Sequence, residues 1–502
     1  MKSLLLSLIL AAGASAVFAA PAIDCTQLSR TQFAPDVTID SAKLMAASDE
    51  LPEHCEVRGM FWPDAHFVVK LPTEWNQRFQ MVGNGGWAGT ISESAVNQAI
   101  GMGYASTSTD TGHSSQREPG ATWAMQTDEN PYAARKVIDH GYLSVHETAM
   151  LAKEMIKAYY GEAPQYSYWV GCSTGGRQGL MEAQRYPEDF DGYVIGAPVL
   201  YLTGLQTKAV YNWIQIGPGP GEMSPEDWEL VAGVVNERCD AVDGLEDGLF
   251  ENPLDCDFVP LRDLPRCASG KSSDCLTKAQ IDGVAIVYDG VRDSEGRKVF
   301  PGMPPGPEAM AAGRGGVQSG LAGGLGPSFN LGDTFFKFMA FDDPPGETWD
   351  YHTLDIDRDL PRTRNVGLRI DATIPDLTAA KMHGAKIVHY HGWSDQGVTS
   401  LMSLEYYKKA QATMGVSETE EFWRFFPVPG MFHCAGGPGC GNVDWLSAVV
   451  DWVENGKAPE QLVGAHIENG ETTRTRPICM WPTHAKYNGS GSIDEAGNFS
   501  CE

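Results

Sequence analysis

Trp169-Val170-Gly171-Cys172-Ser173-Thr174-Gly175-Gly176-Arg177 joins an apolar stretch with strand character to a run that suits a helix. The strand-like residues begin at Tyr166, and the helical run continues to Arg185. The two glycines of the G-x-S-x-G pattern leave room for a sharp turn, which lifts the Ser173 hydroxyl clear of the backbone beside a helix N-terminus. An ordinary glycine-rich turn is the alternative, but the flanking strand and helix favour a nucleophile elbow.

Short apolar strands alternate with helices on both sides of this turn. We expect strands at 66–71, 78–82 and 104–109 before it, and at 192–198, 386–390 and 421–426 after it. We expect helices at 137–160, 177–185 and 443–455, the first of them from apolar residues near helical spacing. This alternation predicts an α/β fold with a mostly parallel sheet that is covered by helices on both faces.

Residues 202–371 break this rhythm and are rich in Gly, Pro, Trp, Phe and Cys. The Gly-dense piece from Gly313 to Gly326 lacks the G-K-[S/T] ending of a phosphate loop, which favours a flexible connection. We expect this block to form an inserted lid that shapes a pocket above the sheet. The predicted organisation is a signal peptide at 1–19, a first core part with the nucleophile at 20–201, the lid at 202–371, and a second core part at 372–502.

The N-terminal segment is typical of a secretory signal peptide. One lysine precedes a short apolar run from Leu4 to Ala12, and small residues follow up to Ala20. The run is too short to span a membrane, and a buried N-terminal helix is the less favoured alternative. We therefore expect a secreted or periplasmic protein, in which disulfides persist. The net charge of −28 argues against nucleic acid or an anionic membrane as a partner.

A serine nucleophile needs a histidine base and a carboxylate that orients the base. In sheet hydrolases with this elbow, the acid and then the histidine follow the serine, each on a loop after a strand. Asp395 ends the motif His391-Gly-Trp-Ser-Asp395 just past one expected strand, and His433 lies just past the next. A lone histidine is usually structural, but the order and placement predict a catalytic triad of Ser173, Asp395 and His433.

The neighbours of the proposed nucleophile and base are both cysteines. Cys172 precedes Ser173, and Cys434 follows His433. If the serine and histidine are within hydrogen-bond reach, their neighbours lie within the span of a disulfide. We therefore predict a Cys172–Cys434 bridge; two buried free thiols are disfavoured in an exported chain. The eleven cysteines include no C-x-x-C pair, which argues against zinc, and the odd number leaves one thiol over.

Two further segments carry candidate polar sites. The oxyanion hole is expected to combine the Thr174 N–H with a donor from Gly83-Asn84-Gly85-Gly86-Trp87, where Gly85 and Gly86 are favoured over a plain tight turn. In the segment 240–249, three aspartates and two turn glycines suit calcium, with the Leu245 and Leu249 carbonyls completing the shell. It departs from the EF-hand pattern, and an acidic surface turn is the alternative. Cys239 and Cys256 flank this segment.

With these motifs in view, the chain resembles the tannase and feruloyl esterase family of exported serine esterases. The matching motifs are Gly83-Asn-Gly-Gly86, Gly171-Cys-Ser-Thr-Gly-Gly-Arg177, the loop from Asp240 to Leu249, Phe341-Asp-Asp-Pro344, His391-Gly-Trp-Ser-Asp395 and Val428-Pro-Gly-Met-Phe-His-Cys434. The arrangement Cys-Ser, Asp, His-Cys is highly specific to this family. The resemblance implies an α/β-hydrolase fold with a large lid inserted between the nucleophile and the acid.

The resemblance also implies a metal site and a disulfide order. The lid would carry a structural Ca²⁺ held by Asp240, Asp243, Leu245, Asp247 and Leu249. The family's pairs would be Cys25–Cys55, Cys239–Cys256, Cys267–Cys275 and Cys479–Cys501, which leaves Cys440 free.

The implied activity is hydrolysis of esters of aromatic carboxylic acids through an acyl-enzyme. Feruloyl and hydroxycinnamoyl esters are expected first, with a tannase for galloyl esters or a mono(2-hydroxyethyl) terephthalate hydrolase as alternatives. The substrate would be a small aromatic ester released from a plant polymer or a polyester. A calcium-dependent binding protein that has lost its chemistry is the non-enzymatic alternative, which the intact Ser, Asp and His weigh against. The residues of the lid that contact substrate are not assigned.

Overall fold

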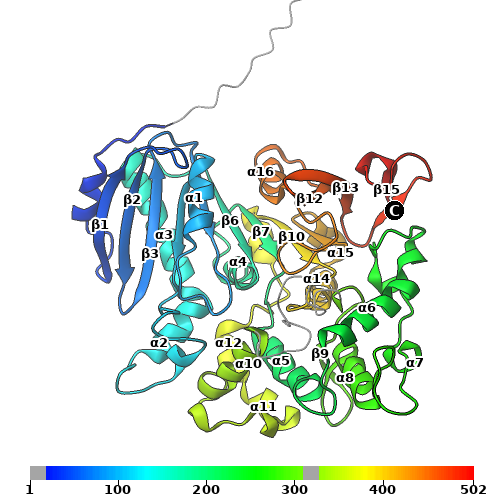
Figure 1. Cartoon of the computed structure of the whole chain (residues 1–502). Coiled ribbons are helices and arrows are strands. Elements are labelled where there is room, and N and C mark those ends of the chain that lie inside the picture. The colour runs from blue at the N-terminus through cyan, green and yellow to red at the C-terminus, as the bar shows by residue number, and fades with distance from the viewer. Residues whose placement is uncertain (1–18, 309–326) are drawn as a thin grey trace, which may run out of the picture.

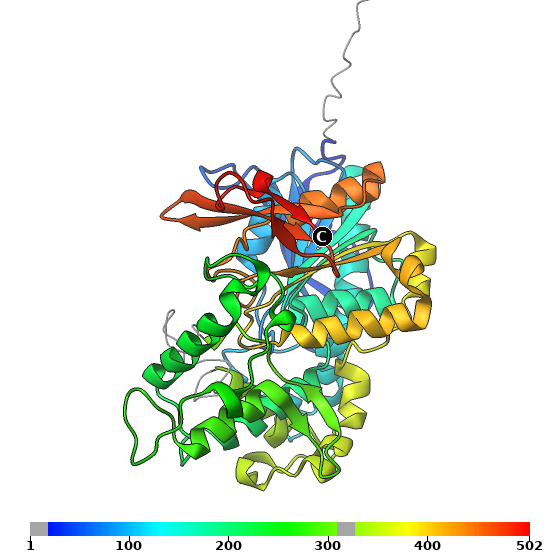
Figure 2. The same ribbon diagram turned by 90° about the vertical axis from the view of Figure 1, so that its right-hand side faces the viewer.

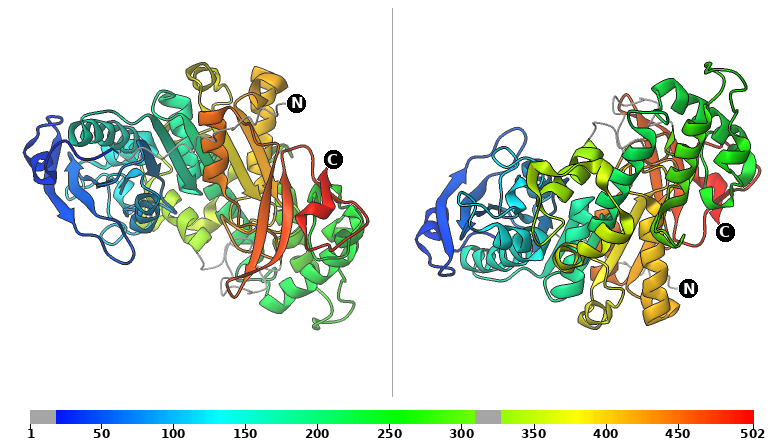
Figure 3. Two further views of the ribbon diagram at one scale, coloured as in Figure 1. Left: turned by 90° about the horizontal axis from the view of Figure 1, so that it is seen from above. Right: turned by 90° about the horizontal axis from the view of Figure 1, so that it is seen from below.

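The computed structural model describes residues 19–308 and 327–502, which are built around one nine-stranded sheet (Figure 1). The strand order is β1-β2-β3-β5-β4-β6-β7-β10-β11. The six strands from β5 onward in this order are parallel to one another: β5 (Ala105–Thr109), β4 (Arg78–Val82), β6 (Tyr166–Cys172), β7 (Gly192–Gly196), β10 (Lys386–Gly392) and β11 (Trp423–Val428). Helices lie on both faces of the sheet, so the α/β class is confirmed (Figure 3).

The sheet is less parallel than expected at its N-terminal end. Two strands that the pattern analysis missed, β1 (Val37–Met45) and β2 (His54–Phe61), pair antiparallel with each other, and β2 pairs antiparallel with β3 (Ala65–Pro72). β3 in turn pairs antiparallel with β5. β1 forms the sheet edge, and its residues are mostly exposed, so its sequence lacks the apolar run by which the central strands are recognised.

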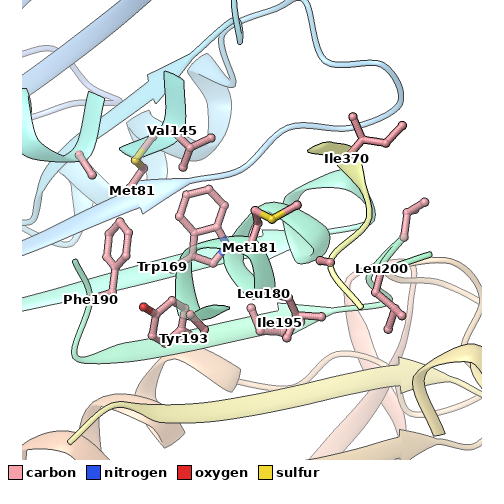
Figure 4. Close-up of a cluster of buried hydrophobic side chains, with 14 of the residues drawn as sticks. Met81, Val145, Trp169, Leu180, Met181, Phe190, Tyr193, Ile195, Leu200 and Ile370 are labelled. Carbon is pink, nitrogen blue, oxygen red and sulfur yellow. The ribbon is translucent and has the colours of Figure 1, made fainter. Parts of the chain in front are cut away.

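Alternate residues of the central strands face two different helix layers. Trp169 and Ile195 point to the layer of α3 (Ser144–Tyr160), α4 (Thr174–Arg185) and α14 (Ser400–Met414), and all three helices contribute to the main core. Tyr168 and Val194 point to the other face, where they pack with residues of α1 (Glu93–Gly101) and α16 (Trp445–Asn455). Figure 4 shows Trp169 and Ile195 packed with Leu180 and Met181 of α4. This packing fixes α4, which begins next to Ser173, against the sheet.

The helix expected at 137–160 is interrupted by a π-helical turn. The structure has α2 (Ala133–Ile138), one π turn (Asp139–Leu143) and then α3. A Cβ on Gly141 would lie 2.3 Å from the Arg369 carbonyl oxygen, so the chain needs glycine at this close approach. The buried Arg177 guanidinium also binds the His140 and Gly141 carbonyls at 3.0 Å each. These long-range contacts account for the local change in helical pitch.

The insertion between β7 and β10 consists of two parts that pack differently, and its helices lie together below the sheet in Figures 1 and 2. Residues between Ile216 and Met303 form a hydrophobic core of their own, whereas Phe335, Phe336 and Ile370 belong to the main core. The elements of this region are α5 (Leu202–Ile216), α6 (Pro225–Cys239), α7 (Pro260–Asp263), α8 (Lys278–Asp289), β8 (Gly290–Arg292), β9 (Lys298–Pro301), α10 (Pro327–Phe338), α11 (Ile356–Arg362), α12 (Arg364–Ile370) and α13 (Thr378–His383).

The chain ends in two small hairpins beside β11. They are formed by β12 (Gln461–Glu468) with β13 (Glu471–Cys479), and by β14 (Ala485–Tyr487) with β15 (Phe499–Cys501); a short helix, α15 (Val416–Glu420), precedes β11. Within 19–308 and 327–502, no helix is both long and apolar enough to cross a membrane. Residues 1–18 of the expected signal peptide and the Gly313–Gly326 connection lie outside the described residues.

Candidate active site

Ser173 lies in the turn between β6 and α4 and has a strained backbone. Its φ is 63° and its ψ is −123°, a conformation that side-chain-bearing residues rarely adopt. Its N–H donates to the Gly196 carbonyl at 3.0 Å, and its own carbonyl accepts from the N–H groups of Arg177 and Val199 at 3.1 Å each. These bonds to β7 and the segment after it hold the strained turn, which has the geometry of a nucleophile elbow.

The elbow closes because neighbouring residues have no side chain. A Cβ on Gly171 would lie 2.5 Å from the Gly175 carbonyl oxygen, and a Cβ on Gly176 would lie 2.4 Å from the Gly196 oxygen. Backbone atoms cannot yield at these distances, so the motif glycines are required by packing between β6, α4 and β7.

Asp395 and His433 lie on the loops after β10 and β11 and are hydrogen-bonded to each other. His433 Nδ1 donates to Asp395 Oδ2 at 2.6 Å. The Asp395 side chain is completely buried, while 27% of the His433 side chain is exposed. Asp395 Oδ1 accepts from the N–H groups of Gly397 and Val398 at 2.9 and 2.8 Å, which fixes the carboxylate plane.

The electrostatics of this pair suit a base held by an ionised acid. Burial raises the pKa of Asp395, but the charge of His433 and hydrogen bonds from His391 and His433 outweigh it and hold that pKa below its usual range. For His433, burial lowers the pKa, yet the charge and hydrogen bond of Asp395 leave it raised overall. Asp395 is therefore ionised, and it stabilises the protonated form of His433.

The structure brings the predicted nucleophile and base loops together through a disulfide. Cys172 and Cys434 are bonded, with Cα atoms 6.0 Å apart, across a sequence separation of 262. The other four expected pairs, Cys25–Cys55, Cys239–Cys256, Cys267–Cys275 and Cys479–Cys501, are also formed. Cys440 is left as a buried free thiol.

The predicted oxyanion loop contacts the first turn of α4. Thr174 Oγ1 donates to the Gly86 carbonyl at 2.5 Å, and the Gly175 N–H donates to the Asn84 carbonyl at 2.7 Å. A Cβ built on Gly85 or Gly86 would meet no atom within 4 Å, so the loop borders open space there. The loop of Gly85 and Gly86 therefore lies against Thr174, the residue that follows Ser173, and their role as oxyanion donors stays a prediction.

Two buried side chains of α4 that sequence reasoning did not single out hold this region. Gln178 bonds Asn84 twice, accepting from its N–H at 3.0 Å and donating to its Oδ1 at 2.9 Å. Arg177 donates to the carbonyls of the π turn and to the Ile370 carbonyl at 3.1 Å, which ties α4 to the end of the insertion. Their position directly after the glycines of the elbow is a signal that could have identified them.

A cleft of about 730 Å³ reaches the loops that carry Asp395 and His433. Ser394 and Phe432, the neighbours of Asp395 and His433, line it together with Phe250 of the insertion. His466 and Arg474 of the β12–β13 hairpin also line it. The cleft therefore lies between the insertion, the loops that carry Asp395 and His433, and the β12–β13 hairpin, and its lining does not include Ser173, Asp395 or His433 themselves.

The loop proposed for calcium is closed by its own carboxylates. Asp240 Oδ1 accepts from the N–H groups of Asp247 and Gly248 at 3.1 and 2.8 Å, and Asp243 accepts from those of Leu245 and Glu251 at 3.1 Å each. Asp247 is also bonded to Arg476 at 2.6 Å. Burial raises the pKa of Asp243, and the neighbouring carboxylates Asp247 and Asp240 add to the effect. An all-oxygen donor set with mutual repulsion fits a hard cation such as Ca²⁺.

A serine on a strained strand–helix turn, followed by an Asp–His pair on the loops after two parallel strands, defines an α/β-hydrolase. The sequence pattern of the family described as "Tannase and feruloyl esterase" matches residues 50–502. The chain therefore belongs to the tannase and feruloyl esterase family, and it is a carboxylic ester hydrolase.

Individual relatives agree with this assignment. The chain is 31% identical over 456 residues to a probable feruloyl esterase B-2 of Aspergillus terreus, covering 86% of this chain and 82% of the relative. It is 29% identical over 540 residues to a mono(2-hydroxyethyl) terephthalate hydrolase of Piscinibacter sakaiensis, covering 92% and 87%. The crystal structure of feruloyl esterase B from Aspergillus oryzae superposes with a TM-score of 0.86 at 26% identity, covering 95% of this chain and 99% of that chain.

Proposed function

We propose that this protein is a serine carboxylesterase that hydrolyses esters of aromatic carboxylic acids, with feruloyl and other hydroxycinnamoyl esters as preferred substrates. The observation that carries the serine mechanism is the Cys172–Cys434 bridge, which holds the loop of Ser173 beside the loop of His433. The similarity to feruloyl esterases in sequence and in fold supports the substrate class.

The proposed reaction follows from the hydrogen bonds of the site. Because His433 Nδ1 donates to Asp395, Nε2 of the neutral ring is the acceptor that takes the Ser173 proton. Ser173 Oγ attacks the ester carbonyl, and the N–H groups of Thr174 and Gly85 or Gly86 stabilise the oxyanion. The imidazolium then protonates the leaving alcohol, and an acyl-enzyme forms. Water attacks this acyl-enzyme with His433 again as base, which releases the acid and restores Ser173.

Labelling with a fluorophosphonate tests the nucleophile directly. We expect one adduct, on Ser173, and no adduct in Ser173→Ala. This result would exclude the alternative of a calcium-dependent binding protein without chemistry. An unlabelled Ser173 in folded protein would favour that alternative instead.

Relative rates test the acyl specificity. Methyl ferulate, a galloyl ester and a mono(2-hydroxyethyl) terephthalate are the three substrates to compare, since a relative acting on the terephthalate ester is nearly as similar as the feruloyl esterases. We expect the highest kcat/KM on methyl ferulate. Negligible rates on all three, with Ser173 still labelled, would overturn the aromatic-ester proposal and leave the serine mechanism intact.

We further propose that the protein is exported and that the 240–249 loop holds a structural Ca²⁺. The five disulfides support export, because such bonds persist in oxidising compartments. When bound, Ca²⁺ would neutralise the carboxylates of Asp240, Asp243 and Asp247 and order the insertion. N-terminal sequencing of protein recovered from the native host tests export; an intact Met1 in the extracellular or periplasmic fraction would contradict cleavage at residue 19.

A further inference from the structure

A second histidine contacts the Asp395 carboxylate. His391 Nε2, from β10, lies 3.2 Å from Asp395 Oδ2 and 2.8 Å from the Val398 carbonyl oxygen. Both partners are acceptors, so Nε2 carries a proton and donates to them. The side chains of His391 and Asp395 are both completely buried. The Oδ2 atom that His391 contacts is the same atom that accepts from His433.

The other ring nitrogen of His391 is bound by Ser403 of α14. Ser403 Oγ lies 2.7 Å from His391 Nδ1 and 3.0 Å from Nε2 of His389. A ring whose one proton is on Nε2 offers Nδ1 as an acceptor, so in this tautomer the Ser403 hydroxyl donates to His391 and accepts from His389. Burial lowers the pKa of His389 well below its usual value, which keeps His389 neutral. The hydrogen bonds thus share one direction: His389 donates to Ser403, Ser403 to His391, and His391 to Asp395.

This chain of hydrogen bonds differs from the other supports of Asp395. The N–H groups of Gly397 and Val398 bind Oδ1, whereas His391 binds the oxygen that His433 uses. A donor on the shared oxygen withdraws negative charge from it and restricts rotation of the carboxylate. Both effects act on the orientation and proton affinity of His433.

The charged and titratable groups around Asp395 come from three further elements. His389 and His391 lie on β10, His433 follows β11, and Lys208 lies on α5. Burial lowers the pKa of Lys208 to about 8, and the Asp395 charge opposes this shift. Lys208 Nζ also contacts Met303 Sδ at 3.1 Å. Since Lys208 is unchanged in any His391 or Ser403 variant, differences among those variants report on the His391 contact.

We propose that His391 is a positioning residue for ester hydrolysis: held by Ser403 and His389, it keeps the Asp395 carboxylate in line with His433 and draws negative charge from the oxygen they share. This inference rests on the proposed serine mechanism. Without the His391 donor, the shared oxygen interacts more strongly with protonated His433, so the base loses its proton only at higher pH. The carboxylate also becomes freer to rotate, which slows proton transfer.

The test compares His391→Leu, His391→Gln and Ser403→Ala with the full-length wild-type protein. Gln retains an N–H donor near the position of Nε2, whereas Leu removes it. The readouts are the pH dependence of kcat/KM on p-nitrophenyl acetate, the rate of fluorophosphonate labelling, and the melting temperature. His54→Leu is the matched control, because His54 is a buried histidine on β2 that contacts the Pro52 carbonyl.

We expect His391→Leu to lose roughly tenfold in kcat/KM and to shift the acidic limb of the pH profile upward. Gln should recover most of the rate, and Ser403→Ala should shift the limb in the same direction by less. The control should lower the melting temperature without moving the limb. The proposal is overturned if folded His391→Leu keeps the wild-type limb, or if Gln is as slow as Leu. If His391→Leu does not fold, the proposal is overturned when the acidic limb of Ser403→Ala lies at the same pH as that of wild type. An unlabelled wild-type Ser173 removes the serine mechanism and this proposal together.

Discussion

Cys172 and Cys434 are bonded to each other although 262 positions separate them, and each is the immediate neighbour of a proposed catalytic residue. The bond therefore constrains the backbone of Ser173 against that of His433. Cys434, like Ser173, has a positive φ, of 66°, so both loops are held in unusual conformations at the point where they meet. We therefore expect the bridge to affect the rate of catalysis separately from its effect on unfolding.

Replacing both cysteines by alanine is expected to lower kcat by more than the loss of stability explains. A displacement of about 1 Å between serine and histidine costs about 10²-fold in rate. Enzyme assays at a temperature well below the melting transition measure this effect. Cys267→Ala/Cys275→Ala is the control, because that bridge spans only 8 positions in the insertion. Equal losses of kcat in the two double variants would contradict the prediction.

Ser173→Gly is expected to be more stable than Ser173→Ala, although both are inactive. Glycine adopts the φ of 63° without the steric cost that alanine bears, and relief of such strain contributes on the order of 1 kcal/mol. Urea unfolding of the two variants measures the difference in the free energy of unfolding. A less stable glycine variant would show that the elbow backbone is not strained.

Asp395→Asn is expected to lower kcat by about 10⁴-fold and to move the acidic limb of kcat/KM to lower pH. His433 must be deprotonated to act as base, and its pKa is raised because Asp395 outweighs burial. Removing the carboxylate removes that attraction, so the proton leaves His433 at lower pH. The pH profile on p-nitrophenyl acetate measures this shift. If the acidic limb of Asp395→Asn lies at the same pH as that of wild type, a group other than His433 titrates there.

Glu182→Gln is expected to stabilise the fold at neutral and alkaline pH. Glu182 of α4 is completely buried, and burial together with the adjacent Asp189 carboxylate raises its pKa well above the usual value. The folded state therefore retains a proton that the unfolded state loses above pH about 4.5, so stability falls as pH rises from there through the folded-state pKa. Each pKa unit corresponds to about 1.4 kcal/mol.

Urea unfolding at pH 5 and pH 8 measures the Glu182 effect. The variant should gain more stability over wild type at pH 8 than at pH 5, because glutamine cannot ionise. Glu162 is exposed, so Glu162→Gln is the control. Its free energy of unfolding should differ from that of wild type by the same amount at pH 5 and at pH 8. His146 and Asp189 offer ligand atoms that lie within 4.8 Å of a Glu182 oxygen and of each other, so the unfolding buffers should contain a chelator.

Chelation is expected to lower the melting temperature, and Asp243→Ala should abolish this dependence on calcium. A ligand that binds only the folded state stabilises it by about 2.7 kcal/mol at a concentration 100 times Kd. Calorimetry with and without added Ca²⁺ measures the shift. Asp257→Ala is the control, since this exposed carboxylate of the insertion pairs with Arg262. If metal-free and calcium-loaded wild type have the same melting temperature, the calcium site is refuted.

Local sequence patterns were sufficient for much of the sheet and for the candidate site. β4 matches its predicted range, and β10 and the helix after the elbow lie within a few residues of theirs. The reason is that buried central strands need continuous apolar runs, and an elbow needs glycines where backbone segments meet. The order of Ser173, Asp395 and His433 was readable for the same reason, because each follows such a strand.

Other features depend on contacts between distant segments. The edge strand β1 has no apolar run, so only its pairing with β2 defines it. The π turn at Gly141 exists because Arg177 and the Arg369 carbonyl approach it from elsewhere in the chain. The contact of His391 with Asp395 likewise needs Ser403, from another helix, to bind the opposite side of the ring. The sequence by itself thus determined the parallel strands and the order of the candidate catalytic residues. Tertiary packing alone decided which side chains support them, because local periodicity records that a residue is buried but not which residue it contacts.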